Sequence, residues 1–213
     1  NPAWSDASPI VFIRAFLLLG YIGGMIPHLV DSITSNSLVR FVQTYHEQTA
    51  AIAAEGYALE SGKFGVAIST SGPGATNMIT GIADAYFGSI PVLYITGQVN
   101  TYEYKYDKPL RQQGFQETDI VRIVTPITKY AKFIDCAEDI KYELDKALNI
   151  ALTGRKGPVL LDLPMDIQRA EIDSNKLRGY EINGLSTNVI KNWDEIEELL
   201  FHAKRPLLLL GAG

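Results

Sequence analysis

The feature that most constrains the fold of this chain is a regular alternation of short apolar runs and helical patterns. The apolar runs are bounded by glycine, proline or polar residues, and the stretches between them are long enough for crossover connections. This alternation is typical of an α/β fold with a parallel sheet flanked by helices on both faces. The predicted strands cover residues 16–20, 38–43, 65–69, 91–96 and 158–163.

Helices are predicted between these strands. Residues 47–60 are rich in alanine, and residues 75–86 have spaced apolar positions. In residues 137–152, Ile140, Leu144 and Leu148 fall on one face, which predicts a helix that ends near Gly154. Further along, residues 192–203 predict a helix and residues 206–210 a strand.

One stretch divides the chain. Residues 173–187 are rich in Asn, Ser and Gly and have few large apolar residues, which is typical of a linker. We therefore expect one domain over residues 1–172, a linker over 173–190 and the start of a truncated middle domain over 191–213. The apolar run 10–19 is interrupted by Arg14 and is too short to cross a bilayer, so we expect it in the core.

Composition excludes several classes of protein. A formal net charge of -5 lacks the basic excess on which nucleic-acid binders rely, and no membrane partner is expected either. The single cysteine, Cys136, cannot form an internal disulfide, which fits a reducing compartment, and we expect a cytoplasmic protein. Because no His, Cys, Asp or Glu grouping has metal-ligand spacing, we expect no metal ligands in this chain.

An isolated acid, Glu47, follows the second predicted strand and opens a helix of small residues. It is therefore expected at the carboxyl edge of the sheet, where open α/β proteins bind ligands. Ala50 and Ala51 let the helix pack closely and leave the carboxyl poorly solvated, as suits a group that holds and returns a proton. The alternative is a first-turn acid stabilised by the helix dipole, with His46 either orienting it or starting the helix.

A glycine–proline–glycine turn, Ser71-Gly72-Pro73-Gly74, has the same position after the next predicted strand. Its glycines permit close approaches that other residues do not, and N–H groups at the start of the next helix could receive an anion. The spacing is not that of a nucleotide-binding loop. Taken alone, the turn is as well explained by structure as by function.

Several short motifs occur in one order along the chain. They are His46-Glu47-Gln48, Glu55-Gly56-Tyr57-Ala58, the turn from Thr70 to Asn77, Ala83-Asp84-Ala85, Ile90-Pro91-Val92, Thr96-Gly97-Gln98-Val99, Gly114-Phe115-Gln116-Glu117-Thr118, Ile127-Thr128-Lys129 and the run from Gly157 to Pro164. Together they resemble the amino-terminal pyrimidine-binding domain of thiamine-diphosphate enzymes of the acetolactate (acetohydroxyacid) synthase type, over residues 20–170. The resemblance implies the thiamine-diphosphate-binding fold.

The resemblance also implies roles for single residues. The glutamate that matches Glu47 hydrogen-bonds N1′ of the cofactor's aminopyrimidine, which makes Glu47 the central catalytic candidate. Pro73 and Asn77 match a turn beside the pyrimidine, and Gly23 and Gly24 match a glycine pair near the cofactor. The predicted cofactor-binding residues are Gly23, Gly24, Glu47, Pro73 and Asn77.

Phe115 and Gln116 match a pair that faces the substrate side of a neighbouring subunit's active site in synthases, so Gln116 is the second catalytic candidate. The alternative is that Phe115 packs in the core and Gln116 caps a helix. Residues 100–113 are longer and more aromatic than the matching synthase segment. A different or larger anionic substrate, a solvated loop or a dimer contact would each explain this difference.

The resemblance implies an enzyme that decarboxylates a 2-keto acid such as pyruvate and transfers the acyl carbanion equivalent to a second carbonyl. Alternatives are a related decarboxylase or carboligase, or a non-catalytic dimerisation module. In the family, diphosphate and Mg²⁺ bind through a separate domain with a Gly-Asp-Gly motif, which this sequence lacks, and the middle domain of some members holds FAD. We therefore expect an inactive fragment of a homodimer or homotetramer that shares its active site between subunits.

Overall fold

The centre of the structure is a six-stranded parallel sheet. The computed structural model describes residues 17–35, 37–181, 192–207 and 209. The strands are β1 (Leu17–Gly20), β2 (Arg40–Gln43), β3 (Gly65–Ser69), β4 (Val92–Gln98), β5 (Tyr130–Phe133) and β6 (Val159–Pro164), in the spatial order β2-β1-β3-β4-β6-β5. Because every pairing is parallel, the carboxyl ends of the strands lie at one edge of the sheet.

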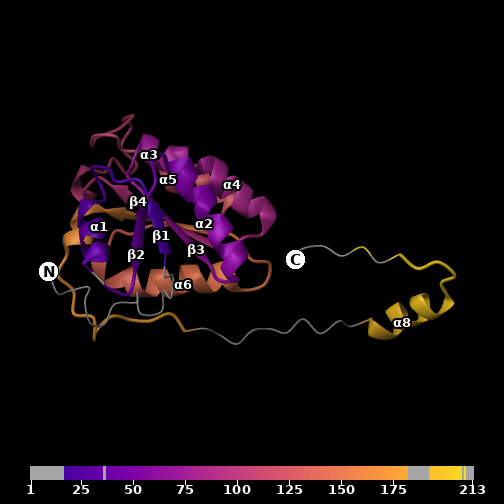
Figure 1. The fold of residues 1–213 in the computed structure, drawn as a ribbon. Coiled ribbons are helices and arrows are strands. Elements are labelled where there is room, and N and C mark those ends of the chain that lie inside the picture. The colour runs from indigo at the N-terminus through magenta and orange to yellow at the C-terminus, as the bar shows by residue number, and fades with distance from the viewer. Residues whose placement is uncertain (1–16, 36, 182–191, 208, 210–213) are drawn as a thin grey trace.

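Helices cover both faces of this sheet, and Figure 1 shows α6 along one side and α3 and α4 along the other. The helices are α1 (Pro27–Thr34), α2 (Glu47–Ser61), α3 (Pro73–Asn77), α4 (Ile79–Gly88), α5 (Ile120–Val124), α6 (Ile140–Leu152), α7 (Met165–Arg169) and α8 (Trp193–His202). Successive strand residues point to opposite faces, so Leu18 packs with α1 and α6 and Leu19 with α2 and α4. The predicted α/β class is confirmed.

The chain reverses its direction across the sheet beside β1. From β1 it runs outward through α1 to β2, and α2 then carries it back past β1 to β3. In open α/β sheets, ligands bind at the carboxyl edge beside such a switch point. The turns that follow β1, β2 and β3 meet at this edge, where the predicted site residues lie.

The five strands predicted before the linker are all present, with small changes at their ends. Residues 16–20, 38–43, 65–69, 91–96 and 158–163 correspond to β1, β2, β3, β4 and β6, and residue 16 lies outside the described residues. Four short elements were not predicted, namely β5, α1, α5 and α7. The predicted helix over 75–86 is divided at Met78, which ends α3 and starts α4. The one over 137–152 begins with a 3₁₀ turn, Ala137–Asp139, and continues as α6.

Toward the carboxyl end, the predicted helix over 192–203 is present as α8, and all of its residues are exposed. The described residues 206, 207 and 209 are not in a strand, so the predicted strand over 206–210 is not observed there. A strand requires a neighbour that pairs with its backbone groups. The boundaries 1–172, 173–190 and 191–213 stay a prediction, and residues 182–191 lie outside the described ranges. Within these ranges, no helix combines the length and apolarity needed to cross a membrane.

Candidate active site

Glu47 is the first residue of α2, directly beyond the end of β2. His46 caps this helix, since its Nδ1 accepts a hydrogen bond from the Gln48 N–H at 3.2 Å. The Glu47 side chain is buried, with 6% of its surface exposed, and its Oε2 accepts a hydrogen bond from Asn77 Nδ2 at 3.0 Å. Its Oε1 accepts no hydrogen bond from the described residues, so one oxygen is held and the other keeps its acceptor capacity.

The turn after β3 leaves space beside that second oxygen. Gly74 is buried, and a Cβ at this position would lie 3.2 Å from Glu47 Oε1 and 2.7 Å from Thr70 Cγ2. Pro73 is exposed at the first position of α3, where its fixed backbone angle suits the helix start. The turn therefore brings Gly74 and Asn77 to Glu47 from a segment about 30 residues further along the chain, with Pro73 exposed directly before Gly74.

The same turn uses two of its first N–H groups internally. The Gly74 N–H donates to Ser71 O at 3.3 Å, and the Thr76 N–H donates to Gly72 O at 3.0 Å. These two donors are therefore not available to an anion, and the anion site considered from the sequence stays a prediction. Gly72 has a φ of +60°, a conformation that favours glycine, so the tight turn itself needs this residue.

Thr70 joins the glycine loop after β1 to the turn after β3. Its Oγ1 accepts a hydrogen bond from the Met25 N–H at 3.0 Å. A Cβ at Gly23 would lie 2.5 Å from Thr70 Cβ, so this approach requires a residue without a side chain. At Gly24 a Cβ would meet nothing within 4 Å, and the residue is exposed. The structure thus brings Gly23 against Thr70 and leaves Gly24 exposed.

Gln116 lies against the other side of the glycine turn. A Cβ at Gly72 would lie 2.8 Å from both Gln116 Cβ and Gln116 O. Gln116 has a φ of +56°, which is uncommon for a residue with a side chain and occurs where the surrounding structure holds it. Phe115 is 72% exposed, and Asp119 rather than Gln116 caps α5. The interpretation of this pair as core and cap residues is therefore wrong, and their roles at the substrate side stay a prediction.

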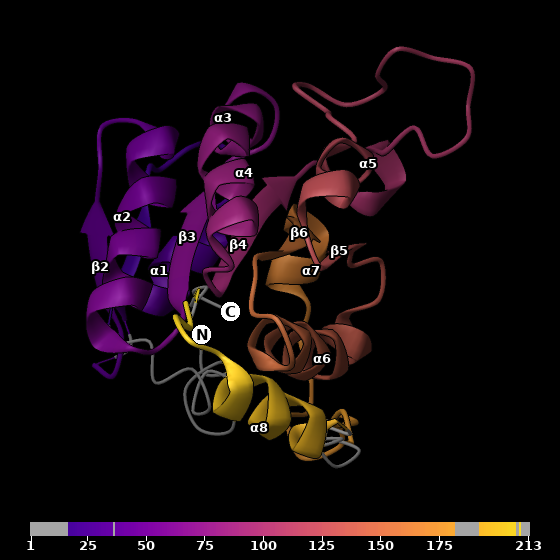
Figure 2. The same ribbon diagram turned by 90° about the vertical axis from the view of Figure 1, so that its right-hand side faces the viewer.

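The loop between β4 and α5 projects beyond the sheet in Figure 2, yet it is anchored at its base. Tyr104 is 8% exposed and stacks on Phe133 with ring centroids 4.6 Å apart, and burial raises the pKa of its hydroxyl above the ordinary value. Asp166 of α7 accepts hydrogen bonds from Thr101 N at 3.0 Å and Thr101 Oγ1 at 2.5 Å. The loop is therefore held against this edge of the sheet by side-chain contacts and is not only a solvent-exposed segment.

Two more carboxyl groups are buried in the fold. Glu55 lies two helical turns along α2 from Glu47, and burial, followed by the nearby Asp84 side chain, raises its pKa to about 8. At Asp162 in β6, burial raises the pKa to about 7, against hydrogen bonds from β4 that favour the charged form. Neither group had been selected from the sequence as a site residue. Buried acids with raised pKa values often gather at functional sites.

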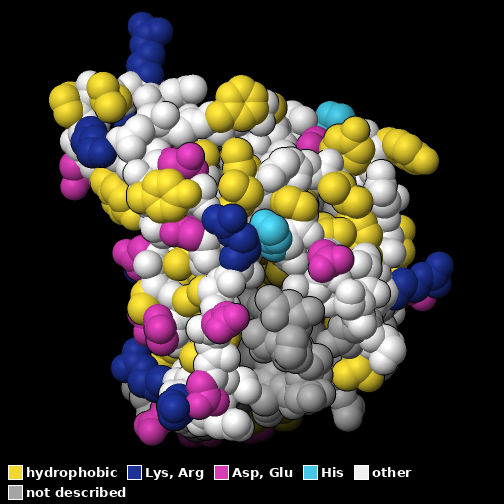
Figure 3. Space-filling model, turned by 90° about the vertical axis from the view of Figure 1, so that its left-hand side faces the viewer, with side chains coloured by type: hydrophobic (Ala, Val, Ile, Leu, Met, Phe, Trp, Pro, Cys, Tyr) yellow, Lys and Arg dark blue, Asp and Glu magenta, His cyan; other side chains and the backbone are white. Residues whose placement is uncertain are grey.

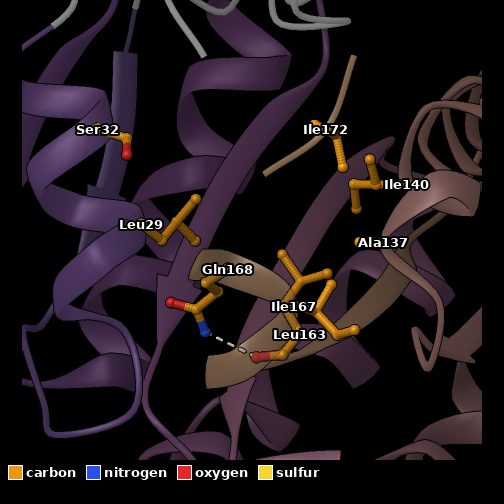
Figure 4. A pocket seen from close by; sticks show the side chains of 8 residues that line it. All are labelled: Leu29, Ser32, Ala137, Ile140, Leu163, Ile167, Gln168 and Ile172. Atoms are coloured by element: carbon orange, nitrogen blue, oxygen red, sulfur yellow. Dashed lines mark hydrogen bonds between the residues drawn. The ribbon is translucent and has the colours of Figure 1, made fainter. Parts of the chain in front are cut away.

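Gln168 of α7 is hydrogen-bonded to the glycine loop after β1. Its Nε2 donates to Met25 O at 2.8 Å and to Leu163 O at 2.7 Å, the second of which Figure 4 shows. The pocket in Figure 4 is lined by Leu29, Ser32, Ala137, Ile140, Leu163, Ile167, Gln168 and Ile172. These residues belong mainly to the α1 and α6 face of the sheet, opposite α2, so this pocket is not the Glu47 site.

Other potential sites are absent or inert in the part of the chain that the structure describes. No group of three or more His, Cys, Asp and Glu side chains there is placed to hold a metal ion. The exposed Cys136 thiol donates to Glu138 at 3.1 Å, which raises the pKa of the thiol and disfavours the reactive thiolate. Figure 3 shows acidic and basic side chains mixed on the face it presents, with no continuous basic area.

The sequence comparisons agree with this geometry. Residues 17–123 match the family described as thiamine pyrophosphate enzyme, N-terminal TPP binding domain. The chain belongs to this family. Thiamine pyrophosphate is thiamine diphosphate, so the family expected from the order of motifs is confirmed, together with the fold of its pyrimidine-binding domain.

The chain is also similar to acetolactate synthases. It is 40% identical over 206 residues to the acetolactate synthase large subunit of Corynebacterium glutamicum, covering 94% of this chain and 32% of the relative. It is 42% identical over 207 residues to the Lactococcus lactis large subunit, covering 92% and 34%. With the mitochondrial catalytic subunit of Saccharomyces cerevisiae it shares 38% identity over 206 residues, covering 92% and 29%. The chain thus spans about a third of the length of the curated relatives it matches.

Proposed function

We propose that this chain is the pyrimidine-binding domain of an acetolactate synthase-like enzyme that depends on thiamine diphosphate. The observation that carries the proposal is the buried Glu47 carboxylate, whose Oε2 is held by Asn77 while Oε1 faces the space beside Gly74. A carboxyl with one free oxygen suits a ring nitrogen that can share a proton, and the missing side chain at Gly74 suits a flat ring. These residues fit an aminopyrimidine.

In this proposal Glu47 holds a proton at Oε1 and exchanges it with the pyrimidine ring nitrogen. Asn77 occupies Oε2 and so directs the exchange through the other oxygen. Gly23, Pro73 and Gly74 position the ring and exclude water from the carboxyl, which strengthens its interaction with the bound ring. Bound thiamine diphosphate supplies the electron sink for loss of carbon dioxide from a 2-keto acid such as pyruvate.

Gln116 and Phe115 serve the substrate side of the same edge. The exposed Gln116 side chain projects from a segment packed against Gly72, in the turn that also carries Gly74. Its amide can donate to the carbonyl oxygen of the acceptor while the exposed Phe115 ring covers the apolar part of the substrate. We assign Gln116 the catalytic role of orienting the second carbonyl for acyl transfer.

The exposed surface of α2 and α4 supports a subunit interface. Four apolar side chains on these adjacent helices are exposed, namely Ile52, Leu59, Tyr86 and Phe87. Apolar surface of this kind is typical of a face that a partner covers. We propose a cytoplasmic homodimer or homotetramer in which the phosphate-binding domain of another subunit supplies the diphosphate and Mg²⁺ site, and any FAD belongs to a domain other than this one.

A carboligase that takes a larger anionic acceptor is the second candidate. One observation favours it, because the β4–α5 loop presents Tyr102, Tyr106, Lys108 and Arg111 as exposed side chains. Aromatic rings and cations together suit an acceptor that has both a carbonyl and an anionic group. Neither nucleic acid nor a membrane is proposed as a partner.

Product analysis with pyruvate as the only substrate tests the proposed reaction. The holoenzyme that contains this chain is supplied with thiamine diphosphate and Mg²⁺, and acetolactate is the expected product. Acetaldehyde as the main product would contradict the synthase and favour a decarboxylase. Consumption of pyruvate only after an anionic aldehyde or ketone is added would favour the carboligase.

A further inference from the structure

One buried acid closes the loop between β4 and α5. Glu117 is 7% exposed, and its Oε1 accepts a hydrogen bond from Lys105 N at 2.9 Å. Its Oε2 accepts hydrogen bonds from Gln113 N at 2.6 Å and Gly114 N at 3.0 Å. An ionised carboxylate is an acceptor only, and hydrogen bonds to it are about twice as strong as those between neutral groups. Glu117 therefore joins the two ends of the segment 105–114.

The residues on either side of Glu117 are fixed to the sheet. A Cβ at Gly114 would lie 2.7 Å from Val99 Cγ1, so the backbone at Gly114 lies directly on the end of β4. On the other side, Gln98 Nε2 donates to Thr118 O at 2.9 Å and to the buried Asp162 carboxyl at 2.9 Å. Phe115 and Gln116 lie between these two anchors.

Gln116 needs such support because its backbone is in the left-handed region, with a φ of +56°. A residue with a side chain keeps this conformation only where its surroundings hold it. The hydrogen bonds of Glu117 to Gln113 and Gly114 hold the segment directly before it, and Gly72 packs against Gln116 itself. Release of the loop would allow Gln116 to relax away from the turn beside Glu47.

We propose that Glu117 is a positioning residue for the substrate side, which holds Gln116 against Gly72 by closing the loop 105–114. The proposal rests on the function proposed above for Gln116. It concerns the acceptor side of the site and not the cofactor, because none of the hydrogen bonds of Glu117 involve the Glu47–Asn77 pair. The two sides can therefore be separated by experiment.

The Glu117→Gln variant is the direct test, since it replaces one acceptor oxygen with an amide donor that faces backbone N–H groups. Glu103→Gln is the matched control. Glu103 is a carboxylate in the same loop that accepts hydrogen bonds from Asn100 N at 3.2 Å and Asn100 Nδ2 at 2.6 Å, and it has no hydrogen bond to residues 113–116. Both variants are compared with the wild-type holoenzyme.

Amide hydrogen exchange at residues 105, 113 and 114 is expected to become at least about tenfold faster in Glu117→Gln and to stay unchanged in Glu103→Gln. In steady-state kinetics, kcat/KM for the acceptor is expected to fall about tenfold or more in Glu117→Gln. The Kd for thiamine diphosphate and the exchange rate of its C2 proton should remain within about twofold of wild type. Glu117→Asp, which keeps the charge, should recover part of the loss in kcat/KM.

Two results would overturn the proposal. One is faster amide exchange in Glu117→Gln with unchanged kcat/KM for the acceptor. The other is an equal loss of acceptor kinetics and cofactor affinity, which would make Glu117 a general stabilising residue. If Glu117→Gln does not fold, Glu117→Asp decides between the same outcomes. A wild-type protein that neither binds thiamine diphosphate nor exchanges its C2 proton would instead contradict the proposed function, while the amide exchange still reports on loop closure.

Discussion

The turn after β3 and the loop after β4 lie at the same edge of the sheet but are held in different ways. At the turn, Gly74 and also Gly23, which belongs to the loop after β1, approach Thr70 so closely that a Cβ would lie 2.7 Å and 2.5 Å from its side chain. In the loop, Glu117 and Asp166 accept hydrogen bonds from backbone N–H groups. The turn therefore requires glycines, which have no side chain, whereas the loop is held by carboxylate side chains.

The two kinds of support match the two ligands proposed for this edge. The turn faces the cofactor, and the loop faces the substrate. The turn lies beside Glu47, where the proposed pyrimidine ring leaves no room for added atoms. The loop carries the aromatic segment 100–113, which we expect to be longer than the matching synthase segment. Hydrogen bonds to a few acids can anchor a loop of different length and composition. We infer that the turn specifies the cofactor and that the loop specifies the substrate.

The largest change in stability is expected from an added methyl group at Gly23, which lies against Thr70. In Gly23→Ala the new Cβ would lie 2.5 Å from Thr70 Cβ and Cγ2, so the backbone of the loop must move. Overpacking of this kind costs about 2–3 kcal/mol of the free energy of unfolding. Urea unfolding measures the loss, and calorimetric titration with thiamine diphosphate should show weaker binding.

Gly24→Ala is the matched control because a Cβ at Gly24 meets nothing within 4 Å. Its effect on the free energy of unfolding is expected to stay within about 0.5 kcal/mol. Equal losses in the two alanine variants would mean that the close contact with Thr70 is not what the turn requires.

A smaller and pH-dependent loss is expected for Thr96→Val, which removes the hydroxyl that donates to Asp162 Oδ1 at 2.6 Å. Burial raises the pKa of Asp162 from 3.8 to about 7, and this hydroxyl opposes the rise because it favours the charged form. Because the folded pKa is the higher one, the free energy of unfolding attributable to Asp162 falls as pH rises from about 3.8 to about 7. Without the hydroxyl the folded pKa rises further, so the fall continues to a higher pH and its total size is larger.

Thr96→Val should therefore cost about 2 kcal/mol at pH 8 and less than about 1 kcal/mol at pH 5. Urea unfolding at both pH values measures this difference, and Thr80→Val, at an exposed position of α4, serves as the control. A cost that does not change with pH would show that the Thr96 hydroxyl is not coupled to the charge of Asp162.

The smallest effect is expected for Asp166→Asn at the base of the loop. The asparagine carbonyl can still accept from Thr101 N while its amide donates to Thr101 Oγ1, so chiefly the charge is lost. A loss of about 0.5–1 kcal/mol is expected, with faster amide exchange at Thr101. Asp173→Asn, at an exposed residue that pairs with Lys176 and accepts a hydrogen bond from Asn175 N, should change the free energy of unfolding by less than about 0.5 kcal/mol. A reversed order of the two would contradict the anchoring role of Asp166.

Much of the fold follows from local sequence patterns. The apolar runs predicted β1, β2, β3, β4 and β6, and the alanine-rich stretch predicted α2, because these patterns act over a few neighbouring residues. The short elements were missed for the same reason. In β5 the sequence Tyr-Ala-Lys-Phe is half-buried at the edge of the sheet and shows no clear period, and α5 and α7 have five residues each.

The site was predictable only in part. The order of motifs identified Glu47, Pro73, Asn77 and Gln116, and the structure places them at one edge of the sheet. Thr70 and Glu117 stand inside those motifs but were not selected, because their partners come from distant turns or from backbone N–H groups that no residue type identifies. The contact of Gln168 with Met25 spans 143 positions of sequence and depends entirely on tertiary packing.

The central claim is that Glu47 exchanges a proton with the bound cofactor, and exchange of the cofactor's C2 proton with deuterium tests it most directly. The holoenzyme is compared with Glu47→Gln and with Glu55→Gln, which changes another buried glutamate of the same helix. We expect exchange to be at least about 100-fold slower in Glu47→Gln and within about threefold of wild type in Glu55→Gln. Exchange at the wild-type rate in a folded, cofactor-bound Glu47→Gln protein would contradict the account.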